Sequence, residues 1–412
     1  MVDKTLKVYG YRWVVLSVFM LIVGMTQLLW ITFAPITNIA ARFYNTSDLI
    51  IGALSMSFMI VYIIIVVPAA WLIDKRGFHI AAGVGALITA IFALTRGIFA
   101  SDLNIVFISQ IGIAIGQPFV LGAITKVAAK WFPVNERATA TGFGTLAIYI
   151  GILIAMVLTP YLVIKNGIEN MLLIYGIASA ILAMAFVIFA RENPPTPPYH
   201  YENKERPLMF EGIKHIFRQR DFILLMVIFF VGLGIFNAVS TWIEKIVEPR
   251  GFSISQAGIL GGVMLIGGIL GAIIMPLFSD RYLKRKPFII MSLIGLVPGL
   301  IGMTFARSYW LLLLSGFVFG FFLLSAGPIG FQYGAEITFP APEGTSNSAL
   351  LVMGQISGII FIFGMDLFKS KNGGSMTISM LMLIGLTLLS LILSILLKES
   401  SLIKPKEQAA ED

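Results

Sequence analysis

The chain has 412 residues, of which 58% are apolar and 12% charged, whereas soluble domains carry about 45–50% apolar and about 25% charged residues. This composition excludes an ordinary soluble globular protein and indicates one that crosses a membrane many times. The chain has no cysteine, which excludes disulfides, thiolate metal sites and cysteine nucleophiles.

Long apolar segments follow one another along the whole chain. A helix needs about 20 apolar residues to cross a bilayer core. On this scale the sequence predicts an all-α membrane protein with twelve transmembrane helices. In chain order the predicted spans are 13–36, 50–73, 78–100, 104–128, 138–164, 170–190, 222–243, 254–279, 287–306, 309–334, 347–368 and 375–397.

The loops between these spans differ in charge. Cytoplasmic loops of membrane proteins are enriched in Lys and Arg. If both termini are cytoplasmic, 21 of the 29 basic residues lie on that side and 8 on the other. We therefore interpret the net charge of +8 as an orientation signal in a multi-pass cell-membrane protein, and expect no nucleic-acid partner. The eight bases on the other side are Arg42, Arg96, Lys165, Lys245, Arg250, Arg307, Lys369 and Lys371.

Two polar motifs recur at nearly one offset. Asp74, in the turn "AAWLIDKRG" after the second span, has a counterpart 206 positions later at Asp280, in "PLFSDRYLKRK". In "WFPVNERATATG" the Phe, Pro and Glu have counterparts 207 positions later in "TFPAPEGTSNSA", which pairs Glu136 with Glu343. Apolar helices that are similar by chance would not repeat Asp, Pro and Glu at nearly the same offset. The sequence therefore predicts an internal duplication.

The duplication sets the expected domains. We expect a six-helix bundle at 1–190, a cytoplasmic linker at 191–220, a second six-helix bundle at 221–397 and a cytoplasmic tail at 398–412. The prolines of the linker favour an extended chain. Its later part is either solvated or forms an amphipathic helix on the membrane surface.

Two six-helix repeats related by an axis along the membrane normal are the plan of the major facilitator superfamily. The turn at 74–77 and its repeat at Asp280 and Arg281 resemble that superfamily's G-x-x-x-D-R-x-G-R loop signature, with Ala70 and Lys75 as departures. The resemblance implies the major facilitator fold and transport by alternating access, in which the two bundles rock about a central site.

The charged residues of these turns are candidates for conformational control. A carboxylate at a helix junction can accept hydrogen bonds from the free amides of a helix start and can pair with a base on a neighbouring helix. Such a pair could latch the two bundles in one state, or it could only anchor the helix ends. The gating candidates are Asp74, Arg76, Glu136, Arg137, Asp280, Arg281 and Glu343.

Three stretches resemble a narrower group, the feline leukaemia virus subgroup C receptor family. They are "RWVVL" at 12–16, "WLIDKRG" at 71–77 and "EITFPAPEGTS" at 336–346. Members of that family import choline and ethanolamine and have been linked to haem. The resemblance therefore implies a small organic substrate.

The family's pocket residues can be carried over by position. Its first-span tryptophan, which packs on the choline cation, falls on Trp30, and its eleventh-span glutamine falls on Gln355. Its fifth-span glutamine falls on Tyr149 and its seventh-span tyrosine near Asn237, so these two positions depart from the family pattern.

The side-chain chemistry of the candidates is informative without the family resemblance. A buried indole binds a cation through its ring face, although tryptophan is also common in the interfacial belt of membrane proteins. Amides within spans need partners, and each could instead be a hydrogen bond between helices. The substrate-binding candidates are Trp30, Gln27, Gln117, Tyr149, Asn237, Gln332 and Gln355.

No acidic or basic residue lies near the middle of a predicted span. An anion carrier needs a central base, and a proton-coupled carrier needs a titratable group. We therefore expect facilitated uniport of a cationic or neutral polar solute, such as choline, by a functional monomer that contacts membrane lipid and needs no cofactor or metal. The alternative is a proton-coupled carrier of organic acids or drugs. No catalytic motif such as H-E-x-x-H or G-x-S-x-G occurs, so no enzyme is expected.

Overall fold

A computed structural model describes residues 8–133, 136–196, 216–339, 343–370 and 374–400. These residues are mostly α-helical, and no strand occurs among them. The chain forms two compact units, Met1–Asn203 and Lys204–Asp412, and the division falls inside the expected linker. Most of that linker, 197–215, lies outside the described residues, so its two alternatives are not addressed by the structure.

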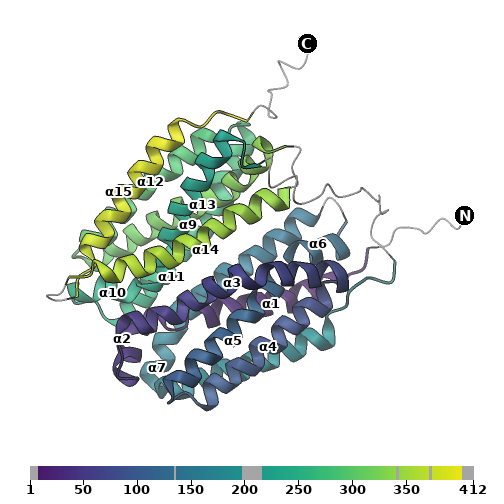
Figure 1. Cartoon of the computed structure of the whole chain (residues 1–412), viewed down its shortest axis with the longest axis horizontal. Helices are drawn as coiled ribbons and strands as arrows, with labels where there is room; N and C mark the ends of the chain where they lie inside the picture. Colours follow the sequence, from purple (N-terminus) through teal and green to yellow (C-terminus); the bar gives the residue numbers. More distant parts are fainter. Residues whose placement is uncertain (1–7, 134–135, 197–215, 340–342, 371–373, 401–412) are drawn as a thin grey trace, which may run out of the picture. The chain divides into compact units, whose positions relative to one another are not determined.

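The first unit begins with an interrupted helix and ends with one very long helical segment (Figure 1). Its elements are α1 (Arg12–Ile31), η1 (Ala34–Ile36), α2 (Thr37–Phe43), α3 (Asp48–Arg76), α4 (Phe78–Ile98), α5 (Leu103–Leu121), α6 (Ile124–Trp131) and α7 (Arg137–Phe189).

The second unit follows the same order of long helices. Its elements are α9 (Arg220–Thr241), α10 (Ile243–Val247), η3 (Glu248–Arg250), α11 (Ile254–Arg281), α12 (Lys286–Phe305), α13 (Tyr309–Ile337), α14 (Glu343–Leu367) and α15 (Thr377–Ile395).

Eleven helices of the described chain are long and apolar enough to cross a membrane, one fewer than the sequence predicts. The difference lies in α7, whose 53 residues would measure about 80 Å as a straight helix, far more than a bilayer core of about 30 Å. The helix is broken at Gly167, whose φ is 79°. Thr159 and Tyr175, which flank Gly167 symmetrically, share a hydroxyl hydrogen bond of 2.8 Å. The segment α7 therefore folds back on itself and contains the predicted spans 138–164 and 170–190.

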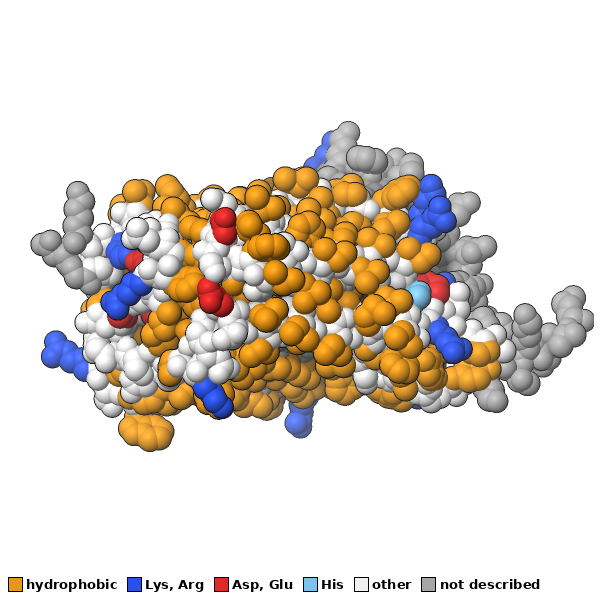
Figure 2. Space-filling view, turned by 90° about the horizontal axis from the view of Figure 1, so that it is seen from below, with side chains coloured by type: hydrophobic (Ala, Val, Ile, Leu, Met, Phe, Trp, Pro, Cys, Tyr) orange, Lys and Arg blue, Asp and Glu red, His pale blue; other side chains and the backbone are white. Residues whose placement is uncertain are grey.

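Apolar side chains cover the flank of the molecule. Figure 2 shows them across the middle of the visible face, with charged side chains gathered mostly toward its ends. Large residues such as Ile64, Val67 and Ile181 are more than half exposed. Exposed apolar surface on this scale suits lipid, because lipid tails are as apolar as these side chains.

The helix ends in each unit are not equivalent, and one of them collects most of the bases. We call this the positive end. In the first unit it is where α1 begins, α3 ends at Arg76 and α7 ends at Phe189, and in the second it is where α9 begins and α11 ends at Arg281. The Tyr11 hydroxyl, just before α1, donates 2.7 Å to the Phe189 carbonyl and so ties the first helix to the last.

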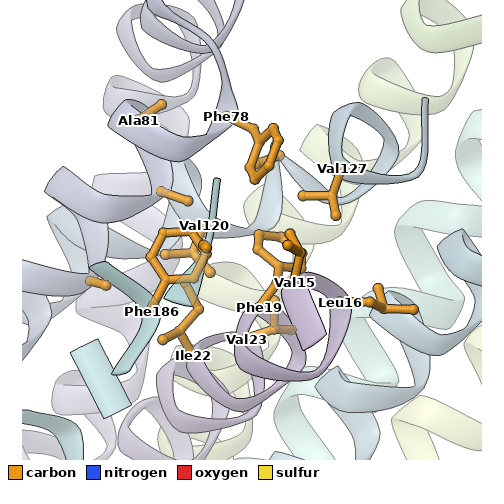
Figure 3. Close-up of a cluster of buried hydrophobic side chains, with 14 of the residues drawn as sticks. Val15, Leu16, Phe19, Ile22, Val23, Phe78, Ala81, Val120, Val127 and Phe186 are labelled. Atoms are coloured by element: carbon orange, nitrogen blue, oxygen red, sulfur yellow. The ribbon is translucent and has the colours of Figure 1, made fainter. Parts of the chain in front are cut away.

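A hydrophobic core supports the positive end of the first unit. Figure 3 shows Val15 and Phe19 of α1 facing Phe78 of α4, Val127 of α6 and Phe186 of α7. All five side chains are fully buried. Helices from across the unit thus meet directly beneath its charged residues and hold them in fixed positions.

Glycine lets several helices approach closely. The chain of α1 crosses α7 at Gly24 and Gly151, where a Cβ added to Gly151 would collide with the Gly24 carbonyl oxygen. In the second unit, a Cβ on Gly320 of α13 would collide with the Met264 carbonyl of α11 in the same way. Such small-residue contacts drive helix association in membranes, where apolar burial between helices gives little.

Substitution at the α1–α7 crossing tests this packing. We expect Gly151→Ala to lower the melting temperature of the purified protein, because overpacking costs about 1–3 kcal/mol. Gly142→Ala in the same helix is the control, since an added Cβ there meets nothing within 4 Å. Replacing that helical glycine is expected to be neutral or to stabilise by up to about 1 kcal/mol. Equal melting temperatures for the two variants would contradict a tight crossing.

Candidate functional site

Trp30 lies in the last turn of α1, and its side chain is only 6% exposed. Its indole Nε1 donates 3.2 Å to the Ser55 carbonyl of α3. A belt tryptophan at the membrane surface would be more exposed, so this burial argues against that alternative. Because the N–H edge is already used, a cation bound here would contact the ring face, which carries the negative part of the quadrupole.

Three further binding candidates lie in the same unit as Trp30, on α1, α5 and α7. Gln27, one turn earlier, and Gln117 of α5 are buried, and neither makes a hydrogen bond with the described part of the chain. Tyr149 of α7 is half-buried, two residues from the crossing at Gly151. Buried amides almost always have partners. Gln27 and Gln117 therefore have hydrogen-bonding capacity available for a polar solute.

The second unit repeats part of this arrangement. Asn237 stands 207 positions after Trp30, is 9% exposed, and donates from Nδ2 to the Gly354 carbonyl of α14 at 3.1 Å. The neighbouring Gln355 is half-buried and has no hydrogen-bond partner among the described residues. Asn237 thus has a helix–helix hydrogen bond, while Gln355 keeps a free amide.

Gln332 belongs to a different part of the structure. Its side chain is exposed, and Nε2 donates 3.0 Å to Glu336 Oε1 one turn later in α13. This contact places Gln332 among the charged residues of the positive end, with Glu336 as its partner, and not with the buried amides. No group of three or more His, Asp or Glu side chains suited to a metal ion occurs in the described ranges.

Two of the gating candidates of the first unit, Asp74 and Glu136, form ion pairs within that unit. Asp74 accepts from Lys126 Nζ of α6 at 2.9 Å, as expected for a carboxylate facing a base on a neighbouring helix. Glu136 pairs with Arg12 at 3.0 Å, and Arg137 Nε donates to the Phe132 carbonyl. Arg76 is exposed.

A different carboxylate caps the helix after the Asp74 turn. Glu192, which follows α7, accepts from the His79 backbone N–H at 2.8 Å in the first turn of α4. Gly77 permits this close approach with a φ of 86°, and a Cβ there would collide with the Glu192 carboxylate. The carboxylate that caps the His79 amide therefore comes from the residues that follow α7.

The same cap occurs in the second unit at the same offset. Glu399 stands 207 positions after Glu192 and accepts from the Arg285 and Lys286 backbone N–H groups at 2.7 and 3.3 Å. We call Glu192 and Glu399 the capping glutamates. A carboxylate at a helix N-terminus satisfies free amides and complements the helix dipole.

Arg285 is the centre of the charged network in the second unit. Its guanidinium bonds Asp280 and, at 3.1 Å, Glu336. Burial disfavours its charge, but the hydrogen bonds and negative charges of Asp280 and Glu336 outweigh burial and hold the pKa of Arg285 above its usual value. The sequence pointed instead to Arg281, which is exposed. The side chain of Glu343, the remaining candidate, lies outside the described residues.

One base departs from expectation. Arg96, placed by the charge count in an outside loop, lies in the last turn of α4 with a fully buried side chain. Its Nη1 donates to Gln110 Oε1 of α5 and, at 3.4 Å, to the Leu29 carbonyl of α1. Nothing in the residue pattern predicts this burial, apart from a polar residue in each of two neighbouring spans.

The fold and these sites together define a class. Two repeated units of membrane-length helices, with matching charged turns and unpaired amides within the spans, are the build of a major facilitator type transporter. A family model described as "Major Facilitator Superfamily" matches residues 15–362. The chain belongs to that superfamily and is a multi-pass membrane transporter, not an enzyme.

Relatives confirm the narrower resemblance as well. Solute carrier family 49 member A3 of Xenopus tropicalis is 32% identical over 377 residues, which cover 86% of this chain and 77% of that protein. Choline/ethanolamine transporter FLVCR2 of Homo sapiens is 29% identical over 396 residues, which cover 90% of this chain and 75% of that protein.

Solved structures support the fold. A bacterial homolog of the human lysosomal transporter Spinster matches with a TM-score of 0.74 at 16% identity, covering 95% of this chain and 97% of that one. The nucleoside transporter NupG matches with a TM-score of 0.72 at 16% identity, covering 93% and 99%. At this identity the likeness concerns the fold alone.

The capping glutamates give a testable symmetry. We expect Glu192→Ala and Glu399→Ala each to lower stability by about 1 kcal/mol, the usual cost of losing a helix cap. Because the two caps lie in separate units, their effects on the melting temperature should add in the double variant. Arg76→Ala, at the same end with an exposed side chain, is the control and should have little effect. Strong non-additivity would indicate that the two caps do not act independently.

Proposed function

We propose that this transporter carries a small organic cation, choline or a related amine, by facilitated uniport. The observation that carries the proposal is the buried indole of Trp30, whose N–H is bonded to Ser55 and whose position matches the pocket tryptophan of the related family. A desolvated cation–π contact contributes about 2 kcal/mol or more. The name of the human relative, a choline/ethanolamine transporter, points to the same substrate class.

In this proposal the polar end of the solute is bound by neutral groups. Gln27, Gln117 and the Tyr149 hydroxyl supply donors and acceptors from the first unit. These groups can hydrogen-bond a hydroxyl or ammonium without taking up a proton at neutral pH. A solute bound in this way needs no coupled proton.

The charged residues of the positive end serve the conformational cycle. The excess of bases there favours a cytoplasmic location for that end. We propose that the contacts around Asp74, Glu136 and Asp280 stabilise the outward-open state, and that the bundles 1–190 and 221–397 rock to expose the solute on the other side.

A second candidate is a carrier of organic acids, and one observation favours it. Arg96 is fully buried, and no carboxylate of the described residues pairs with it. A buried base without an acidic partner is a common way to bind an anion. The substrate test below separates the two candidates.

The first test is thermal stabilisation of the purified protein. A ligand that binds the folded state raises the melting temperature by mass action. We expect choline to raise the melting temperature of the wild type. We expect Trp30→Ala to remove at least about 90% of the affinity for choline, which corresponds to the loss of a cation–π contact. Trp310→Ala is the matched control, because Trp310 is 80% exposed.

Other outcomes would change the proposal in different ways. Stabilisation by organic acids that does not depend on Trp30 would support the second candidate. Stabilisation by choline that is equal in Trp30→Ala would leave the substrate class standing but remove Trp30 from the site.

The second test concerns the Asp74 turn. The pair with Lys126 is partly exposed, with 55% of the Asp74 side chain accessible, and exposed pairs contribute only about 0–1 kcal/mol to stability. We expect Asp74→Asn to leave the melting temperature nearly unchanged but to increase labelling of cysteines introduced at the positive end. If Asp74 acts through Lys126, then Lys126→Gln will reproduce the change. Unchanged labelling in Asp74→Asn would remove this turn from the gating mechanism.

A further inference from the structure

The regular helix of α1 stops directly after Trp30. It ends at Ile31, and the short η1 turn, whose second residue is Pro35, follows before the chain continues into α2. Proline has no N–H, so it cannot bond the Ile31 carbonyl four residues earlier. The last carbonyl groups of α1 therefore need partners from side chains or from other helices.

One of these carbonyls receives an unusual set of donors. The Leu29 oxygen accepts from Arg96 Nη1 at 3.4 Å and from Gln110 Nε2 at 3.4 Å, while the Thr32 hydroxyl donates to the neighbouring Leu28 carbonyl at 2.8 Å. Arg96 in turn donates to Gln110 Oε1, so the two side chains form one linked clamp. We call Arg96 and Gln110 the α1 clamp. It joins α4 and α5 to the residue that precedes Trp30.

The charge of the clamp suits its place. The C-terminus of a helix carries a partial negative charge, and a cation there is stabilising. The guanidinium carbon of Arg96 also lies 5.7 Å from the centre of the Phe33 ring, one turn beyond Leu29. Arg96 thus contacts both sides of the break in α1, through Leu29 before it and Phe33 after it.

The Trp30 indole donates its N–H to the Ser55 carbonyl. Its orientation also depends on where the last turn of α1 lies, and that turn is fixed by the clamp. We propose that Arg96 is a positioning residue of the substrate site: with Gln110 it holds the end of α1 so that the Trp30 ring face meets the solute cation. This inference rests on the proposed function.

The clamp differs from an anion site in what it uses. Nη1 is engaged with an amide oxygen and a backbone carbonyl, both neutral acceptors that belong to the protein. Nε and Nη2 have no hydrogen-bond partner among the described residues. If Arg96 instead binds an anionic solute, these two donors must contact that solute. Replacing Arg96 would then weaken the binding of organic acids.

The experiment compares choline with its neutral carbon isostere, 3,3-dimethylbutan-1-ol, on the full-length purified protein. Both compounds fill the same volume, but only choline gains from the indole ring face. We expect Arg96→Gln to reduce the ratio of choline affinity to isostere affinity about tenfold, the equivalent of a lost or misplaced cation–π contact. A general loss of stability would weaken both compounds alike and leave the ratio unchanged.

Two further variants keep the test decisive. Arg96→Lys retains the cation at the end of α1, so its ratio of choline affinity to isostere affinity should lie close to that of the wild type. Gln110→Leu removes the other half of the clamp and should lower this ratio. Gln110→Leu also serves if Arg96→Gln does not fold. Arg42→Gln is the matched control, because Arg42 is an exposed base on α2 beyond the same break.

The outcomes are separable. If choline binds the wild type and the ratio is unchanged in Arg96→Gln and Gln110→Leu, the positioning role is wrong. If Arg96→Gln abolishes binding of organic acids and leaves choline unaffected, Arg96 is an anion ligand and the clamp proposal is overturned. If choline does not bind the wild type at all, the proposed function fails first.

Discussion

A helix that ends in the interior of a protein leaves its last carbonyl groups without backbone partners, and no water is there to replace them. The break in α1 after Trp30 creates this need at the candidate site. It is met by Thr32 from the same segment, which bonds the Leu28 carbonyl, and by Arg96 and Gln110 from two other helices, which bond the Leu29 carbonyl. The same constraint that limits where a transporter can interrupt a helix therefore brings a base and an amide to the residue beside the proposed cation ligand.

The duplicated units meet related constraints with equivalent positions but not always with equivalent residues. The capping glutamates keep both residue type and offset, because free amides at a helix start need the same acceptor in each unit. Trp30 and Asn237 also share the offset, and both donate an N–H to a carbonyl of an adjacent helix. Only Trp30 adds a ring face. The repeat thus provides a common frame, and the difference between the units gives the site its chemistry.

Features that depend on the local pattern of residues could be predicted from the sequence, and features that depend on packing between helices could not. Apolar length and the recurring Asp, Pro and Glu gave the spans and the duplication. The reversal at Gly167 changed only how two predicted spans are joined. Arg281 and Arg285 look alike in a basic turn, and only the fold shows that Arg285 reaches both Asp280 and Glu336. Arg96 looked like a loop base because a charge near a helix end is normally exposed, and its burial depends on α1 and α5.

The proposed site requires that a solute cation bind near a base that is itself buried. The two charges repel, so the guanidinium must be compensated without a carboxylate. The end of α1 provides this compensation through its carbonyl dipoles, and the Gln110 oxygen and the Phe33 ring add to it. Cation–π attraction acts within about 6 Å of the ring. The repulsion from Arg96 is weaker than that of a free charge, because the acceptors that contact the guanidinium offset part of its positive charge. Neutral compensation leaves the indole as the group that distinguishes a cation from an uncharged solute.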